Sequence, residues 1–194
     1  MNRNTILKLL GVLVIALMTV GAVATAQTTW YVDATNGLAS NNGKAATQTG
    51  VDVGPKQSIT QLLLLGASGP QDGDVINIAV GIYSDEPNIT KALTINGYIP
   101  SGSTATDVNF SSGTNPIEFS HTGTTTLKVG AVAALAPATR IDFTTTGLNG
   151  VRGVKLTSGV VAFTTSEVRL SSGVTVTRVT GSFAAAPTFS STGA

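Results

Sequence analysis

The chain has 194 residues, a formal net charge of +1 and 11% charged residues, and it contains no cysteine. These values exclude disulfide bonds, thiolate metal sites and a strongly basic surface, so no nucleic-acid partner is expected. The length suits one domain or two small ones. With 22 glycines and many Thr, Val and Ser residues, the composition predicts a turn-rich all-β protein with a polar, weakly charged surface.

Residues 1–26 have the pattern of a secretory signal peptide. Arg3 and Lys8 precede an apolar stretch, Leu9–Val20, and Ala24-Thr25-Ala26 forms an A-x-A cleavage site. We therefore expect cleavage after Ala26 and a secreted or cell-surface product that meets the membrane only through its signal peptide. The alternative is an uncleaved membrane anchor, because the apolar stretch is nearly long enough to span a bilayer.

Residues 27–74 are predicted to form an N-terminal cap. It begins with a strand at 28–33 and contains the one good helix candidate, Pro55–Gly66. Ser58 and Gln61 have the spacing of a capping box, and Gly66 suits the position after the helix. Four consecutive leucines leave this helix little polar surface, so we expect it to pack against apolar residues. A buried strand is the alternative for this segment.

The elements that follow complete a recognisable order. An aromatic-Tyr-Val-Asp strand, a Gly/Asn/Ser loop, a helix, a Gly-Asp-apolar strand, a Gly-x-Tyr turn and a Leu-Thr-Ile-x-Gly strand occur at Trp30–Asp33, Asn36–Gly43, Pro55–Gly66, Gly73–Val80, Gly81–Tyr83 and Leu93–Gly97. This order resembles the start of secreted right-handed parallel β-helix proteins of the pectate-lyase-like superfamily. The resemblance covers roughly residues 28–98 and implies a short solenoid with a capping strand and one short helix.

Residues 75–194 are predicted to form the coils of this solenoid. An apolar-x-apolar-Ser/Thr-Gly motif recurs from residue 108 onward, and its best pair, Ile117 and Ile141, predicts that Ile117 lies directly beneath Ile141. A repeat of about 20–25 residues makes one coil, with two strands per coil and about four to five coils in all. The stretch Val154–Phe183 also resembles repeats of large secreted bacterial surface proteins. An antiparallel β-sandwich is the alternative architecture.

Carboxylates that could form a calcium site are few. Glu118, Asp142 and Glu167 have a spacing close to the repeat and could form one column, although Arg169 occupies the motif position of Asp142. Asp72 and Asp74 flank a glycine in a turn. Calcium prefers six to eight oxygen ligands, so Asp72, Asp74, Glu118 and Asp142 are weak calcium candidates. The competing interpretation is that these are isolated surface or turn charges, and no cofactor is otherwise expected.

Other chemistry-bearing residues are equally sparse. Lys128, Arg152 and Arg178 could form a basic column, and His121, the one histidine, is interpreted as a solvated corner residue rather than a general base. Tyr83 and Tyr98 are weak candidates for stacking against a glycan, whereas Trp30 and Tyr31 are expected to cover the open end of the solenoid. No catalytic residue is predicted.

The sequence therefore predicts a secreted or cell-surface structural, adhesin-like β-helix module without catalysis of its own, part of a larger protein. We expect further coils or a partner to continue its C-terminal edge, and a polysaccharide or cell-surface glycan is the candidate ligand. One alternative is the N-terminal part of a polysaccharide lyase or glycoside hydrolase, which the resemblance of residues 28–98 implies. A carbohydrate-binding module is the third.

Overall fold

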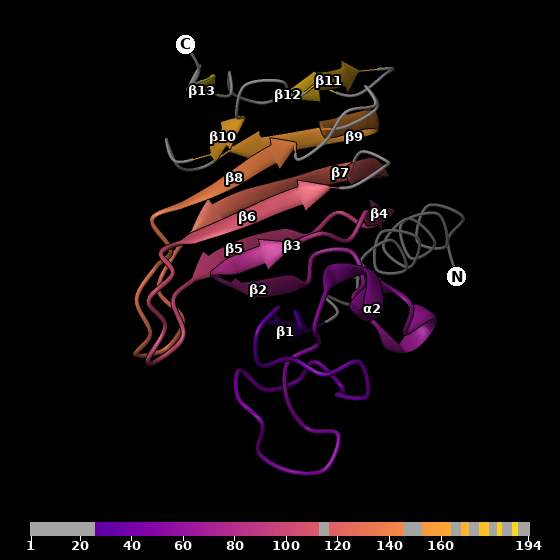
Figure 1. The fold of residues 1–194 in the computed structure, drawn as a ribbon. Helices are drawn as coiled ribbons and strands as arrows, with labels where there is room; N and C mark the ends of the chain where they lie inside the picture. The colour runs from indigo at the N-terminus through magenta and orange to yellow at the C-terminus, as the bar shows by residue number, and fades with distance from the viewer. Residues whose placement is uncertain are drawn as a thin grey trace, which may run out of the picture.

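The computed structural model describes residues 26–112, 117–145, 153–163, 168–170, 175–178, 182–183 and 188–189. Residues 1–25 of the predicted signal peptide 1–26 lie outside the described residues, and Ala26, its last residue, is exposed. β-Strand is the predominant secondary structure of the described chain, as the composition predicted (Figure 1).

The first elements of the chain are β1 (Thr29–Val32), α2 (Ile59–Leu63), a 3-10 turn η1 (Gly66–Ser68), β2 (Val75–Ala79), β3 (Gly81–Tyr83), β4 (Asn88–Ile89) and β5 (Thr94–Tyr98). Longer strands follow at β6 (Asp107–Ser112), β7 (Ile117–Val129), β8 (Arg140–Thr145) and β9 (Gly153–Phe163). The last described strands are β10 (Val168–Leu170), β11 (Thr175–Arg178), β12 (Ser182–Phe183) and β13 (Thr188–Phe189).

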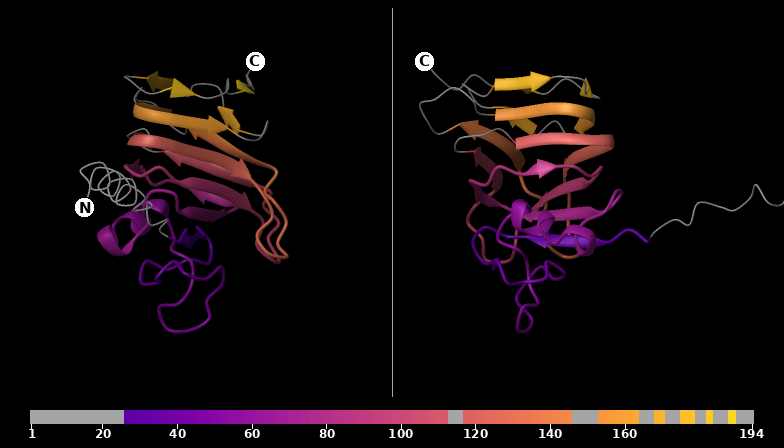
Figure 2. Two further views of the ribbon diagram at one scale, coloured as in Figure 1. Left: turned by 180° about the vertical axis from the view of Figure 1, so that it is seen from behind. Right: turned by 90° about the vertical axis from the view of Figure 1, so that its right-hand side faces the viewer.

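These strands form two parallel sheets. One sheet has the order β1-β2-β5-β7-β9-β11, with β4 paired to β7 and β12 paired to β9; the other has the order β13-β10-β8-β6-β3. Each strand pair between named strands of the described chain is parallel. This arrangement excludes the antiparallel sandwich. Figure 2 shows the strands stacked from β1 at one end to β13 at the other, with the sheets facing each other.

The register corrects the predicted pairing of the repeat. Ile141 in β8 partners Val108 and Val168, which belong to the same sheet. Ile117 in β7 instead partners Val154 in the other sheet. Ile117 therefore does not lie beneath Ile141. The same apolar-x-apolar motif serves strands of both sheets, because each buries alternate side chains in one shared core.

The core lies between the sheets and contains an aromatic row. Tyr83, Phe110 and Phe143 come from β3, β6 and β8, and each ring is at most 3% exposed. The ring centroids of Tyr83 and Phe110 lie 5.7 Å apart, and those of Phe110 and Phe143 lie 5.2 Å apart. Both separations fall in the range of favourable aromatic contacts. The row thus links three successive strands of one sheet.

The cap contains the predicted helix in a shortened form. Ser58 is its N-cap, and the Ser58 hydroxyl accepts a hydrogen bond from the Gln61 amide at 3.3 Å, as predicted. The reciprocal hydrogen bond of a capping box is not formed, because the Gln61 side-chain oxygen has no hydrogen-bond partner. Gly66 has a φ of +58°, which favours glycine, but it begins η1 and does not directly follow α2, because α2 ends at Leu63 with Leu64 as its C-cap. The helix packs against apolar residues, as expected: Leu62 is fully buried in the core and Leu63 and Leu65 pack against it, whereas Leu64 is 79% exposed. A single helical turn directs only one face to the core.

Loop segments of the cap cover the free edge of β1. The Tyr31 amide donates to the Gly43 carbonyl at 2.8 Å, and the Lys56 amide donates to the Tyr31 carbonyl at 3.0 Å. The Asp33 amide donates to the Lys56 carbonyl at 2.8 Å. An edge strand with satisfied backbone groups cannot recruit a further strand. This end of the sheet is therefore closed by the chain itself.

Candidate functional site

Asp74 lies in the turn before β2, where three hydrogen bonds hold its carboxylate. Its Oδ1 accepts from the Thr28 amide at 2.8 Å, and its Oδ2 accepts from the Trp30 indole at 3.0 Å and the Gln71 amide at 2.9 Å. The residue is 5% exposed. Burial acts to raise the pKa of Asp74, but these hydrogen bonds and the Lys44 charge outweigh it and lower the pKa below its ordinary value. Through these hydrogen bonds, the Asp74 carboxylate links β1 to the turn before β2.

Asp72 lies two residues earlier, and one of its oxygens accepts from the Ala92 amide at 2.8 Å. That bond ties the turn before β2 to the loop before β5. Asp72 thus links the turn to the loop before β5, whereas Asp74 links it to β1. No group of three or more His, Cys, Asp or Glu side chains that could hold a metal ion occurs in the described part of the chain.

The predicted acidic column does not form. Asp142 in β8 has Asn109 and Arg169 as its Cα partners, so the arginine predicted to break the column does stand beside it. Glu118 lies in the other sheet, where its partners are Asn88 and Lys155. Glu167 lies outside the described residues. The two described members of the column therefore belong to different sheets.

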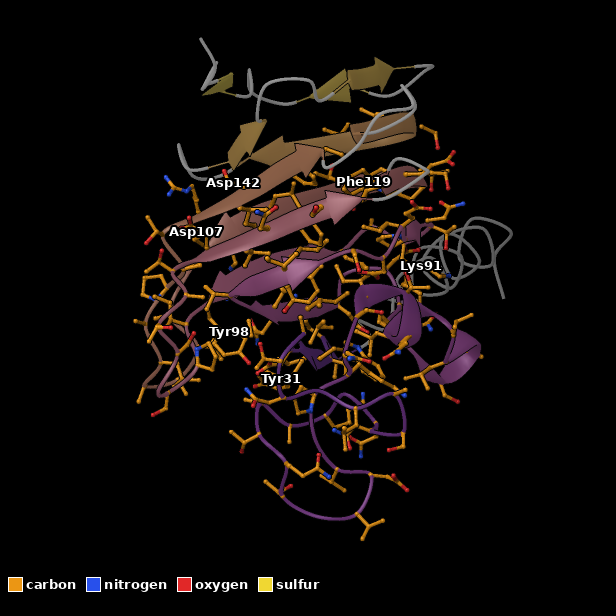
Figure 3. All side chains as sticks on the ribbon, viewed as in Figure 1. Tyr31, Lys91, Tyr98, Asp107, Phe119 and Asp142 are labelled. Atoms are coloured by element: carbon orange, nitrogen blue, oxygen red, sulfur yellow. The ribbon has the colours of Figure 1, made fainter. Side chains whose placement is uncertain are left out.

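Asp142 belongs instead to an ion-pair group on the outer face of β6 and β8. The Arg140 guanidinium contacts the Asp107 carboxylate at 2.8 Å and the Asp142 carboxylate at 3.2 Å. Figure 3 shows Asp107 and Asp142 at the same end of these neighbouring strands. One guanidinium that bridges two carboxylates stabilises the two adjacent strands.

The predicted basic column is not formed either. Lys128 lies in β7, with Asn96 as its Cα partner in β5. Arg178 in β11 partners Leu156 of β9, which in turn partners Phe119, far along β7 from Lys128. Arg152 lies outside the described residues. The register therefore separates Lys128 and Arg178 along the sheet.

The two tyrosines considered for glycan stacking are buried. Tyr83 is 1% exposed, and its hydroxyl donates to the Ala79 carbonyl at 2.7 Å and accepts from the Ala34 amide at 3.2 Å. Tyr98 is fully buried, and its ring packs with Ala79 and Val132. Burial raises the pKa of both hydroxyls, and the Asp33 carboxylate raises them further. In this structure neither ring offers a face to a sugar.

Trp30 was expected to cover one end of the strand stack, and it lies in β1 at that end (Figure 1). The residue is 2% exposed, and the Lys44 ammonium lies over its ring at 3.0 Å from the ring centre. Burial lowers the pKa of Lys44, and the Asp74 carboxylate opposes that change. The indole, the ammonium and the carboxylate together close this end of the core.

Among the hollows in the described part of the chain, three lie around the cap. The first, of about 280 Å³, lies between α2 and β3 and is lined by Ala34, Gln57, Ser58, Gln61, Ile82, Tyr83, Ser84 and Asp85. The second, of about 370 Å³, lies beside the loop 100–105, and the third, of about 300 Å³, lies beside η1 and Lys91. In the first, one Asp85 oxygen accepts from the Thr60 amide at 2.9 Å and hydroxyl at 2.7 Å. Asp85 thus anchors the first turn of α2.

His121 is buried, which corrects its interpretation as a solvated corner residue. It is 4% exposed, and its Nε2 lies 2.8 Å from the Thr125 hydroxyl. Its Nδ1 is buried with no hydrogen-bond partner. Burial lowers the pKa of His121 below its ordinary value, while the Gly123 carbonyl and the Asp72 charge oppose that change.

Sequence reasoning missed a buried polar contact on the outer side of the first sheet. The Asn96 side-chain amide donates to the Asn77 side-chain oxygen at 2.9 Å, across the β2–β5 pair. Both residues are at most 5% exposed because the segment 130–138 covers them. The recurring Ile-Asn pairs in Ile76-Asn77 and Ile95-Asn96 carried the available signal.

Comparison with known proteins gave no match to a family model, to a curated protein or to a solved structure. In the described part of the chain, no helix has the length and apolar character needed to cross a membrane.

Proposed function

We propose that the chain forms a short right-handed parallel β-helix and serves as a structural module of a secreted or cell-surface protein, without catalysis of its own. The observation that carries this proposal is the register of the parallel strands. β3, β6, β8, β10 and β13 pair in chain order within one sheet, while β2, β5, β7 and β9 do so in the other. A chain that returns repeatedly to the next place in each of two sheets has the topology of a solenoid.

The aromatic row supports the same proposal. In a solenoid, equivalent positions of successive coils stack their side chains inside one shared core. Tyr83, Phe110 and Phe143 are such positions, because Tyr83 partners Phe110 and Phe110 partners Phe143. The core thus continues from one strand to the next instead of closing around a single layer.

The state of the chemistry-bearing side chains favours a structural role. Asp74 and Asp85 are held by backbone and side-chain donors of the cap, and Arg140 bridges Asp107 and Asp142. Catalysis in the related enzyme classes needs charges that converge on one face with room for substrate. Here the charges brace neighbouring segments, and this favours a scaffold over the lyase or hydrolase alternative.

The arrangement of the strands can be tested by cysteine cross-linking, because the chain contains no native cysteine. Asn88 and Glu118 are Cα partners in neighbouring parallel strands, and such partners are close enough for a disulfide. The double variant Asn88→Cys/Glu118→Cys should form an intramolecular disulfide, detected by intact mass. The matched control, Glu118→Cys/Asp142→Cys, should not form one. A disulfide in Glu118→Cys/Asp142→Cys and none in Asn88→Cys/Glu118→Cys would overturn the proposed architecture.

The absence of catalysis is tested separately on the purified chain. We expect no unsaturated product and no new reducing ends from pectin, alginate or other uronate polymers, with or without calcium. Appearance of unsaturated-product absorbance would reject the scaffold proposal in favour of a lyase. Retardation of the folded chain in a glycan affinity gel, without turnover, would instead favour a carbohydrate-binding module.

A further inference from the structure

The segment around His121 joins two differently paired halves of β7. The first half pairs with β4 as far as Phe119, and the second half pairs with β5 from Thr126 onward. Between them, Ser120 partners Ser158 and Thr124 partners Val160, so three residues of β7 face the single residue Gly159. We call this bulge, the facing residues 158–159 and the loop 90–93 the His121 corner. In Figure 3 the labelled Lys91 and Phe119 lie near this end of the sheets.

A short chain of hydrogen bonds fixes the imidazole in this corner. The Thr125 hydroxyl donates to the Lys91 carbonyl at 3.3 Å and accepts from the Leu93 amide at 3.3 Å. In this arrangement the single hydroxyl proton goes to the Lys91 carbonyl, so the His121 Nε2, 2.8 Å from the hydroxyl oxygen, carries the hydrogen of its own contact with Thr125. This network assigns the neutral tautomer with a bare Nδ1, the nitrogen that would take up a proton.

The backbone of β9 packs directly against that bare nitrogen. Gly159 has a φ of +79°, and a Cβ built there would lie 2.6 Å from the His121 Nδ1 and 2.8 Å from the Gly123 carbonyl oxygen. The Ser158 hydroxyl donates to the His121 carbonyl at 2.9 Å and closes the same side. This packing holds solvent away from Nδ1, so a charge placed there cannot be hydrated while the corner is closed.

Few charges face the imidazole from the surrounding elements. The turn before β2 brings Asp72, whose negative charge favours the protonated form. Lys91 is the charged residue of the loop 90–93, and Asn88 and Ile89 of β4 are neutral. Ser158 and Gly159 of β9 are neutral as well. The Gly123 carbonyl and the Asp72 carboxylate therefore oppose the effect of burial on the His121 pKa, and burial dominates.

We propose that His121 is a pH-sensitive joint: the neutral imidazole holds the corner closed, and mild acid opens it locally by protonating Nδ1. The proton binds readily only where the corner has opened and water reaches the ring. Acid therefore shifts the equilibrium toward the open form. The two halves of β7 would then separate from Gly159 and from the loop 90–93, while the strands on either side stay paired.

The unmodified chain provides a direct test, because His121 is its one histidine. An NMR titration of the imidazole should give a midpoint below the ordinary value of 6.5. Hydrogen exchange should show protection at the Leu93 and Thr126 amides, corrected for intrinsic exchange, falling up to about tenfold between about pH 7.5 and about pH 5.5. The Asp33 amide at the far end of the sheet should keep its protection. A midpoint at or above 6.5, or a change below about twofold at the corner amides, would overturn the proposal.

Two variants distinguish a pH effect that depends on His121 from a general loss of protection in acid. His121→Gln keeps a donor for the Thr125 hydroxyl but cannot take up a proton, so its corner protection should not vary over the same pH range. Asp72→Asn keeps an oxygen for the Ala92 amide and removes the charge that favours imidazolium, so the His121 midpoint should fall further. Persistence of the full pH effect in His121→Gln would refute the assignment, and the titration of the unmodified chain decides the matter if that variant does not fold.

Discussion

Replacing Phe110 with alanine tests the shared core most directly. The ring of Phe110 is 3% exposed and lies between Tyr83 and Phe143, with ring-centre distances of 5.7 Å and 5.2 Å. The substitution removes the middle member of the row. It therefore breaks the side-chain contact from β3 to β6 and from β6 to β8 in one step.

The expected loss of stability follows from burial and from the two ring contacts. Truncation of a buried phenylalanine to alanine costs about 3–5 kcal/mol, which includes the cavity left behind. Phe110→Leu keeps most of the apolar volume and loses mainly the ring contacts, each of which contributes about 0.5–1.5 kcal/mol. We therefore expect Phe110→Leu to cost roughly 1–3 kcal/mol, clearly less than Phe110→Ala.

Equilibrium unfolding in urea measures these costs, with circular dichroism and the fluorescence of the single tryptophan as independent probes. Ile82→Ala in β3 is the matched control, since Ile82 is 69% exposed. Its effect should stay within about 0.5 kcal/mol. A loss below about 1 kcal/mol for Phe110→Ala would refute the reasoning, because a ring in the shared core cannot be removed so cheaply.

Three further substitutions test local features of the fold. Gly102→Ala places a side chain at a φ of +80° in open space and should lower the free energy of unfolding by about 1–2 kcal/mol. Gly159→Ala has a similar φ but adds an overlap with His121, and it should lower that free energy by about 2–5 kcal/mol. Equal urea midpoints for the two variants would contradict the packing at the His121 corner. Asp74→Asn should destabilise the chain at neutral pH by weakening the bonds from Trp30 and the two amides. Because the pKa of Asp74 is lowered, the stability that its carboxylate contributes is fully present above the ordinary value of 3.8 and is lost as the pH falls through the lower folded value. The urea midpoints of the unmodified chain and the Asp74→Asn variant should therefore converge in acid. A difference that stays constant with pH would count against this role.

The β-rich class and the first strands and helix of the chain could be predicted because their signals are local. Strand formers at 28–33, 75–80 and 92–98 mark segments that the structure places in β1, β2 and β5. The Ser58 cap lies next to the helix that it begins. Such signals act over a few residues, where propensity and capping decide the conformation.

The register of the repeat could not be read in the same way. A spacing of 24 residues matched Ile117 with Ile141, but these residues belong to different sheets. The loops between partnered strands differ in length, so no single period describes them. Alternating apolar residues indicate that a strand has one buried face, but they do not indicate which sheet the strand joins. Which sheet a strand joins is decided by its packing against strands that are distant in the sequence.

Burial of polar residues was equally hidden from the sequence. His121 follows a serine and precedes Thr-Gly, a composition typical of an exposed turn. The structure buries it because β7 continues through that point, with a bulge in place of a turn. The Thr125 hydroxyl, four residues on, then becomes its partner. A strand that bends without ending can thus place a titratable side chain in the interior, where its protonation affects the stability of the surrounding strands.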